Sequence, residues 1–300
     1  MAELTESYGA EAKERVGFFT DTSICIGCKA CEVACKEWNQ LEGNAPKFTA
    51  DSFDNTGQLD AQNWRHVQFI EQVPDNNGVV FNPTPIAGGQ AWLMMSDVCK
   101  HCKNASCMEV CPTNALMRTE YDTVYIQNDV CNGCRNCISA CPYGVIGFNE
   151  EKGIAQKCTL CYDRLQGGLQ PACAKACPTE SIKFGYVDDL HKVADDRLAN
   201  LQKQGYAKAQ LYGRDEKVYG GLNAFFLLMD KPETYGLPNA ENAVLPRRNN
   251  LGGYLTVAVT AVVAAIGGLI ALRRRREPAA VPSPSPVSSG VSSGVPEGES

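Results

Sequence analysis

Sixteen cysteines are the residues of this 300-residue sequence whose type and spacing point to chemistry. They fall into four groups of four, and none is left over. Groups one and three have the spacing C-x2-C-x2-C-x3-C, group two C-x2-C-x4-C-x3-C and group four C-x2-C-x11-C-x3-C. The members, in group order, are Cys25, Cys28, Cys31 and Cys35; Cys99, Cys102, Cys107 and Cys111; Cys131, Cys134, Cys137 and Cys141; and Cys158, Cys161, Cys173 and Cys177.

This spacing predicts four [4Fe–4S] clusters. A cubane cluster takes one thiolate at each of its four irons, and three closely spaced cysteines on a tight loop can ligate three of them. The fourth cysteine of each group is expected at the start of a helix, pointing away to ligate a second cluster. Proline after this fourth cysteine belongs to the same signature, and Lys36 replaces it in group one. The three prolines are Pro112, Pro142 and Pro178.

Residues beside the ligands also suit an iron–sulfur site. Gly27 and Gly133 lie in the tight loops, where positive φ can turn backbone N–H groups towards cluster sulfurs. Nearby cations favour reduction, because reduction adds negative charge to a cluster. The basic residues beside the cysteines are Lys29, Lys36, Lys100, Lys103, Arg135, Lys157, Arg164 and Lys175.

Other uses of the cysteines fit less well. Disulfide scaffolds are typical of short secreted proteins, and residues 1–20 contain neither an apolar secretory segment nor a twin-arginine pair. Zinc takes its ligands as two separated pairs, often with histidine, and only group four resembles that pattern. No C-x2-C pair precedes a histidine, as c-type haem attachment requires. We therefore expect iron on all sixteen cysteines. A zinc-stabilised interaction module on a membrane anchor is the less favoured alternative.

Distance along the chain predicts which groups exchange their fourth ligands. Groups two and three span residues 99–141 and form one compact two-cluster unit, which leaves groups one and four for the other. The rival pairing, one with two and three with four, would place the cysteine-free stretch 41–96 inside a unit. The expected ligand sets are Cys25, Cys28, Cys31 and Cys177 for cluster 1; Cys99, Cys102, Cys107 and Cys141 for cluster 2; Cys111, Cys131, Cys134 and Cys137 for cluster 3; and Cys35, Cys158, Cys161 and Cys173 for cluster 4.

The surrounding sequence predicts an α+β fold of two interleaved ferredoxin-like units with a β-rich insertion. The insertion carries two β-like runs, 65–71 and 91–96, and a turn at 75–78. A strand at 181–187 follows group four. The expected divisions are a lead-in, helical or loose, at 1–20; the cluster domain at 21–187 with the insertion at 41–96; a connector at 188–251; a transmembrane helix at 252–272; and a basic, then disordered, tail at 273–300.

Two helices are predicted beyond the last cysteine. The first is amphipathic and ends near Gly205; its apolar residues are Leu190, Val193, Ala194, Leu198 and Leu201. The second, 252–272, carries no charge and is long enough to cross a bilayer. Its small residues at spacings of four favour a helical membrane partner.

The segments on either side of the second helix are charged or of low complexity, which is not expected for a buried core helix. Four arginines, 273–276, follow it, and a Pro/Ser/Gly tail that cannot bury enough apolar surface to fold comes next. Two arginines, Arg247 and Arg248, precede it. This bias predicts a single-pass protein of the cell membrane with its tail in the cytoplasm and its cluster domain on the periplasmic face.

Three stretches resemble one known family: DTSICIGCKACEVACKEWN at 21–39, KCTLCYDRLQGGLQPACAKACPTESIKFG at 157–185 and AQLYGRDEKVYGGLNAFFLLMDKPETYGLP at 209–238. They are similar to the four-cluster ferredoxin-like subunits of molybdopterin oxidoreductases, above all the β subunit of membrane-bound formate dehydrogenase. The third stretch contains no cysteine and is the more specific. The resemblance covers about residues 15–275, is weak in the insertion, and excludes the tail.

The resemblance implies an electron-transfer subunit. A separate molybdenum or tungsten pterin subunit would oxidise formate, and the electrons would cross the four clusters to a membrane cytochrome b and quinone. The sequence itself shows no nucleophile–base motif, phosphate loop or dinucleotide fingerprint, and a net charge of −6 argues against nucleic acid as a partner. The alternative is the iron–sulfur subunit of a hydrogenase or of a nitrate, sulfoxide or polysulfide reductase.

Overall fold

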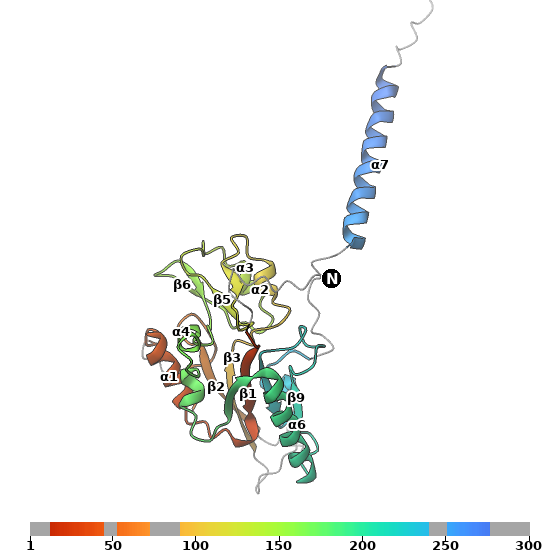
Figure 1. Ribbon diagram of the computed structural model, residues 1–300. Helices are drawn as coiled ribbons and strands as arrows, with labels where there is room; N and C mark the ends of the chain where they lie inside the picture. Colours follow the sequence, from red (N-terminus) through yellow and green to blue (C-terminus); the bar gives the residue numbers. More distant parts are fainter. Residues whose placement is uncertain (1–12, 45–52, 73–90, 240–250, 277–300) are drawn as a thin grey trace, which may run out of the picture. The chain divides into compact units, whose positions relative to one another are not determined.

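The structure, a computed structural model, describes residues 13–44, 53–72, 91–239 and 251–276 (Figure 1). It divides into two units, residues 1–246 and 247–300, which are described separately below. The predicted turn at 75–78, Arg247, Arg248 and the tail 277–300 lie outside the described residues.

A four-stranded mixed sheet joins the two ends of the first unit. Its strands lie in the order β8 (Ile182–Tyr186), β1 (Val16–Asp21), β10 (Ala224–Leu228) and β9 (Gln210–Tyr212). β1 runs parallel to β10 and antiparallel to β8, and every residue of β1 is buried. The prediction of a helical or loose lead-in is therefore wrong for Val16–Thr20. Local pattern could not reveal this strand, because both of its partners lie more than 150 residues away in sequence.

The two faces of β1 belong to different cores. Phe18 packs in the core that contains the buried cysteines, and Phe19 packs in a second core beneath helix α6 (Val187–Lys203). In Figure 1, α6 lies alongside this sheet. The predicted amphipathic helix is confirmed as α6, with Leu190, Ala194 and Leu201 buried; Val193, by contrast, is 43% exposed.

The insertion and the cysteine groups contribute short hairpins. β2 (Arg65–Gln72) pairs antiparallel with β3 (Ala91–Val98), which confirms both predicted β-like runs. Two smaller hairpins follow groups two and three, and β8 follows group four in the same way. The small hairpins are β4 (Leu116–Arg118) with β5 (Val124–Ile126), and β6 (Gly147–Asn149) with β7 (Ile154–Gln156).

Short helices carry the cysteine groups, and the α+β prediction is confirmed in this mixture of helix and strand. The helices of the groups are α1 (Ala30–Asn39), α2 (Ser106–Glu109), α3 (Asn136–Ala140), α4 (Tyr162–Gln166) and α5 (Ala172–Lys175). The described residues of this unit also form two 3-10 helices, η1 (Thr22–Ile24) and η2 (Pro232–Tyr235).

In the second unit the described residues form one helix, α7 (Leu251–Arg276). Its segment Gly252–Arg273 has a mean hydropathy of 2.4 and no buried residues within this protein, and by length and composition it could cross a membrane. This agrees with the helix expected at 252–272.

Gly17 provides a test of the central sheet. A Cβ at this position would overlap the carbonyl oxygen of Asn223, which accepts a hydrogen bond of 2.7 Å from the backbone N–H of Phe18. Because backbone cannot move aside easily, we expect Gly17→Ala to lower the free energy of unfolding by about 3 kcal/mol. The measurement is the unfolding midpoint of the anaerobically purified protein by circular dichroism.

Gly185, the cross-strand partner of Gly17, is the matched control. A Cβ there would make only an ordinary contact of 3.8 Å with Leu190. We expect Gly185→Ala to change the free energy of unfolding by less than about 1 kcal/mol. An equal loss of stability in the two variants would contradict the close packing of Gly17 against the backbone of Asn223.

Candidate iron–sulfur sites

Cysteines from the first and last groups meet at one cavity. Its walls include Cys25, Cys28 and Cys31 of group one together with Cys177, the fourth cysteine of group four. Ser96 of β3 completes part of the wall. The two groups are separated in sequence by the insertion and by groups two and three, so tertiary folding alone brings these four thiols together.

The other three sets are visible in the electrostatic surroundings of single thiols. Burial first, and then the charges of neighbouring cysteines, raise the pKa of each of three thiols, in the case of Cys137 to about 11. The neighbours are Cys158, Cys173 and Cys161 around Cys35; Cys99, Cys107 and Cys141 around Cys102; and Cys131, Cys111 and Cys134 around Cys137. Each fourth cysteine thus lies among the first three cysteines of another group.

The helices place the third and fourth cysteines differently from expectation. The third cysteine is the second residue of its helix in every group, as Cys107 is in α2. The fourth lies just beyond the helix in groups two, three and four, so the predicted position at a helix start is wrong. In these three groups a proline follows the fourth cysteine. Proline disfavours helical backbone at the residue before it, so the helix ends ahead of that cysteine. Group one has Lys36 instead of proline, and α1 continues through Cys35 to Asn39.

A left-handed residue precedes the second cysteine of every group. The φ angles are 66° at Gly27, 44° at His101, 69° at Gly133 and 57° at Leu160. Only the two glycines could be found from sequence, because glycine alone signals this backbone conformation. In group four the consequence is visible, since the backbone N–H of Leu160 donates to Cys158 Sγ at 3.3 Å.

A second set of backbone donors follows the fourth cysteine. Burial favours a higher pKa for the Cys111 thiol, but hydrogen bonds from the backbone N–H groups of Leu116, Thr113 and Ala115 and from the Thr113 hydroxyl outweigh it and lower the pKa. Such donors stabilise a thiolate, the form that binds iron.

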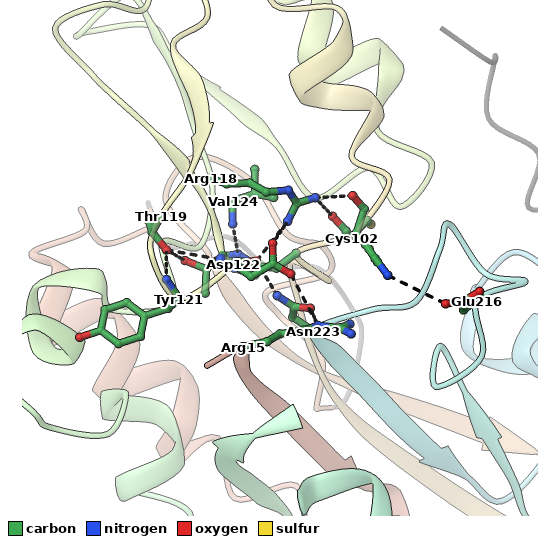
Figure 2. Close-up of polar contacts among 12 residues, drawn as sticks. Arg15, Cys102, Arg118, Thr119, Tyr121, Asp122, Val124, Glu216 and Asn223 are labelled. Atoms are coloured by element: carbon green, nitrogen blue, oxygen red, sulfur yellow. Dashed lines mark hydrogen bonds and ion pairs between the residues drawn. The ribbon is translucent and has the colours of Figure 1, made fainter. Parts of the chain in front are cut away.

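Polar contacts outside the cysteines hold the group-two loop in place (Figure 2). Arg118 donates through Nη2 to the carbonyl of Cys102 at 2.7 Å and through Nη1 to Asp122 Oδ1 at 3.0 Å. Asn223, just before β10, donates to the Asp122 carbonyl at 2.6 Å and accepts from Arg15 Nε at 2.5 Å. The loop that carries Cys102 is therefore fixed to the β4–β5 turn and to the central sheet.

Three buried cations near the cysteines show whether their surroundings suit a negatively charged cluster. Lys100, Lys157 and Arg65 are each at most 2% exposed. Lys100 pairs with Asp97 at 2.5 Å. Lys157 donates to the carbonyls of Val124 and Cys158, and within the described residues neither it nor Arg65 forms an ion pair with a carboxylate. An unpaired buried charge costs several kcal/mol, so a negatively charged cluster on the neighbouring thiolates fits these surroundings.

The basic residues expected near the ligands divide into two kinds. Lys100 and Lys157 are buried among the cysteines. Others contact residues other than the cysteines: Lys36 donates to the carbonyl of Glu42, and Arg164, which is also buried, lies over the ring of Trp38. Sequence reasoning missed Arg65, because this residue lies in the insertion, far along the sequence from any cysteine.

Comparison with known proteins gives the cofactor independently. Two family models described as 4Fe-4S dicluster domains match residues 24–115 and 90–187. With the sixteen cysteines, they confirm four [4Fe–4S] clusters. The matched ranges overlap at group two and do not assign the fourth ligands.

Curated relatives cover most of the sequence. It is 37% identical to the formate dehydrogenase iron-sulfur subunit of Haemophilus influenzae over 230 residues, 75% of this protein and 69% of that one. It is 34% identical to the nitrate-inducible formate dehydrogenase iron-sulfur subunit of Escherichia coli, over 86% of this protein and 84% of that one. The B subunit of the anaerobic dimethyl sulfoxide reductase of E. coli is 37% identical over 61% of this protein and 79% of its own length.

Gly133 tests the loop geometry of group three. A Cβ there would overlap the carbonyl oxygen of Gly153, at a φ of 69° that already favours glycine. We expect Gly133→Ala to lose one cluster, so that the iron content falls from about sixteen to about twelve atoms per protein molecule. Iron analysis of anaerobic protein measures this. Gly153→Ala is the control, since its φ is similar at 66° but its Cβ meets nothing within 4 Å; equal iron loss in both variants would contradict the explanation.

Proposed function

This protein belongs to the family of formate dehydrogenase iron–sulfur subunits, and from that premise we propose that it carries electrons from a formate-oxidising molybdopterin subunit to a membrane cytochrome b. Electron transfer through [4Fe–4S] clusters is the chemistry of the family. Within the protein the clusters supply sites for single electrons, while the polypeptide binds them, excludes water from them and stabilises their charge.

The proposed ligands are the crossed sets predicted from the spacing. Cluster 1 takes Cys25, Cys28, Cys31 and Cys177, and the shared cavity of these residues supports it. The neighbours of Cys102, Cys137 and Cys35 support clusters 2, 3 and 4 in turn. With these ligands, each of the two ferredoxin-like units exchanges its fourth ligands internally, and the unit of groups one and four encloses the other in sequence.

Electrostatic interactions between thiols of different sets support an order for the clusters in space, 1–4–2–3. Burial raises the pKa of three thiols, and the charge of a cysteine from another set raises each of them further. These pairs are Cys31 with Cys173, which links clusters 1 and 4; Cys158 with Cys99, which links 4 and 2; and Cys107 with Cys137, which links 2 and 3. We infer a single row in which electrons pass from each cluster to the next.

The exposure of the cysteines carries this proposal. Among the sixteen, only Cys28 and Cys134 are exposed, and they belong to the proposed clusters 1 and 3. These are the two ends of the inferred row. Electrons can therefore reach one end from a partner protein and leave the other, while the middle clusters stay shielded.

The membrane part of the proposal rests on α7. It places α7 across the bilayer next to a cytochrome b subunit, with the four arginines 273–276 in the cytoplasm and the cluster unit on the opposite side. A reporter enzyme that is active only in the cytoplasm, fused after Ser300, should be active. Activity of a periplasm-dependent reporter at that position would reverse the orientation.

Formate-dependent reduction tests the function as a whole. The intact complex, purified from membranes, should reduce a viologen dye with formate, and formate should produce the EPR signals of reduced [4Fe–4S] clusters. The similarity to the dimethyl sulfoxide reductase subunit makes a sulfoxide reductase the second candidate. Sulfoxide-dependent oxidation of reduced dye, without any formate response, would replace the first proposal by the second.

Cys141→Ala tests the exchange of fourth ligands between groups two and three. We expect it to remove cluster 2, because Cys141 lies near Cys99, Cys102 and Cys107. The signal missing from its EPR spectrum should therefore be the one missing from Cys102→Ala. Cys111→Ala provides the reverse case and should match Cys134→Ala. If Cys141→Ala instead matches Cys134→Ala, the fourth ligands are not exchanged.

A further inference from the structure

Arg65 is a buried guanidinium between two of the cysteine sets. It is the first residue of β2, and its side chain is enclosed, with the residue 2% exposed and Cζ 4.8 Å from the ring centre of Phe18. Its Nη2 donates to Cys173 Sγ at 3.3 Å, and its Nη1 donates to the carbonyl and to Oγ of Ser96 at 3.3 and 3.2 Å.

Thiols are the main counter-charges of Arg65. Within the described residues no carboxylate pairs with it, and its Nε has no hydrogen-bond partner. Burial by itself would lower the pKa of Arg65, but the charges of four cysteines outweigh that effect and raise it, so the guanidinium stays charged. The four are Cys173, Cys31, Cys158 and Cys35, of which Cys31 belongs to the proposed cluster 1 and the others to cluster 4.

Ser96 extends the contact to the second set. Its Oγ lies 3.2 Å from Cys31 Sγ. Because a guanidinium only donates, the serine oxygen accepts from Arg65, and the single hydroxyl proton is left for the sulfur of Cys31. A continuous series of contacts therefore runs from Cys173 through Arg65 and Ser96 to Cys31.

We propose that Arg65 is the shared counter-charge of clusters 1 and 4 and sets the reduction potentials of both. This inference rests on the ligand sets given under the proposed function. An electron added to either cluster increases the negative charge beside the guanidinium, which stabilises the reduced state. Cluster 4 should feel this more strongly, because Arg65 contacts its ligand Cys173 directly and reaches Cys31 through Ser96.

A shared cation also suits transfer between the two clusters. When one electron moves from cluster 1 to cluster 4, the first is oxidised by one electron and the second is reduced by one. The total charge next to Arg65 stays the same. The guanidinium therefore stabilises the electron on both sides of this step, and more strongly on cluster 4.

Redox titration of the intact complex, followed by EPR, tests the proposal. The signals of clusters 1 and 4 are identified first with Cys28→Ala and Cys161→Ala. In Arg65→Met we expect the ratio of reduced to oxidised cluster 4, at a fixed potential, to fall at least tenfold, which is 59 mV for one electron. Cluster 1 should shift in the same direction by less, and clusters 2 and 3 should stay unchanged.

Two further variants separate charge from structure. Arg65→Lys keeps the positive charge and should restore part of the potential of cluster 4. Ser96→Ala removes only the hydroxyl beside Cys31 and should lower the potential of cluster 1 alone. Lys192→Met is the control for loss of one positive charge, since Lys192 is exposed on α6 and among the described residues forms an ion pair only with Asp189; it should move neither potential.

The outcomes are decisive in each case. Unchanged potentials of clusters 1 and 4 in an Arg65→Met complex with full iron content would overturn the proposal. If Arg65→Met does not assemble, Ser96→Ala decides, because an unchanged cluster 1 would equally overturn it. The titration uses dithionite as reductant, so it remains valid even if the wild-type complex fails to respond to formate, which would contradict only the proposed function.

Discussion

The meeting of thiols from distant parts of the sequence is the constraint on which the rest of this structure depends. Cys177 lies with the first cysteine group, and Cys35 lies with the last, so the two ends of the cluster domain are tied to each other at two places. The central sheet repeats the connection, because β1 near the N-terminus pairs with β8 and β10 near the end of the unit. Cluster binding and sheet formation therefore require the same global arrangement.

Burial of charge is the second theme. The cysteines form part of the hydrophobic core, where unpaired thiolates are costly, and two buried cations next to them have no carboxylate partner within the described residues. Once a negatively charged cluster is bound to the thiolates, the buried cations balance its charge, and the cluster in turn balances theirs. Protein stability and cluster binding are coupled in this way, as in other metal sites whose ligands release protons when the metal binds.

The same arrangement supports the row of clusters in the proposed function. In that proposal, thiols of adjoining sets interact electrostatically in the order 1–4–2–3, and only the terminal sets contain an exposed cysteine. Arg65, with Ser96 as its extension, adds a fixed positive charge at the first junction. A row of this kind needs partners only at its ends.

The sequence by itself determined the local features of this protein: the cluster type, the four loops, α6 and the apolar helix, since each depends on residues close together in the sequence. Only the tertiary structure decided that Val16–Thr20 lie in a central strand and that Arg65 lies between two sets. Strand pairing and buried charge contacts join residues far apart in sequence, so no local pattern records them. His101 and Leu160 show the same limit, since their left-handed backbone is imposed by the surrounding fold and not by their own preference.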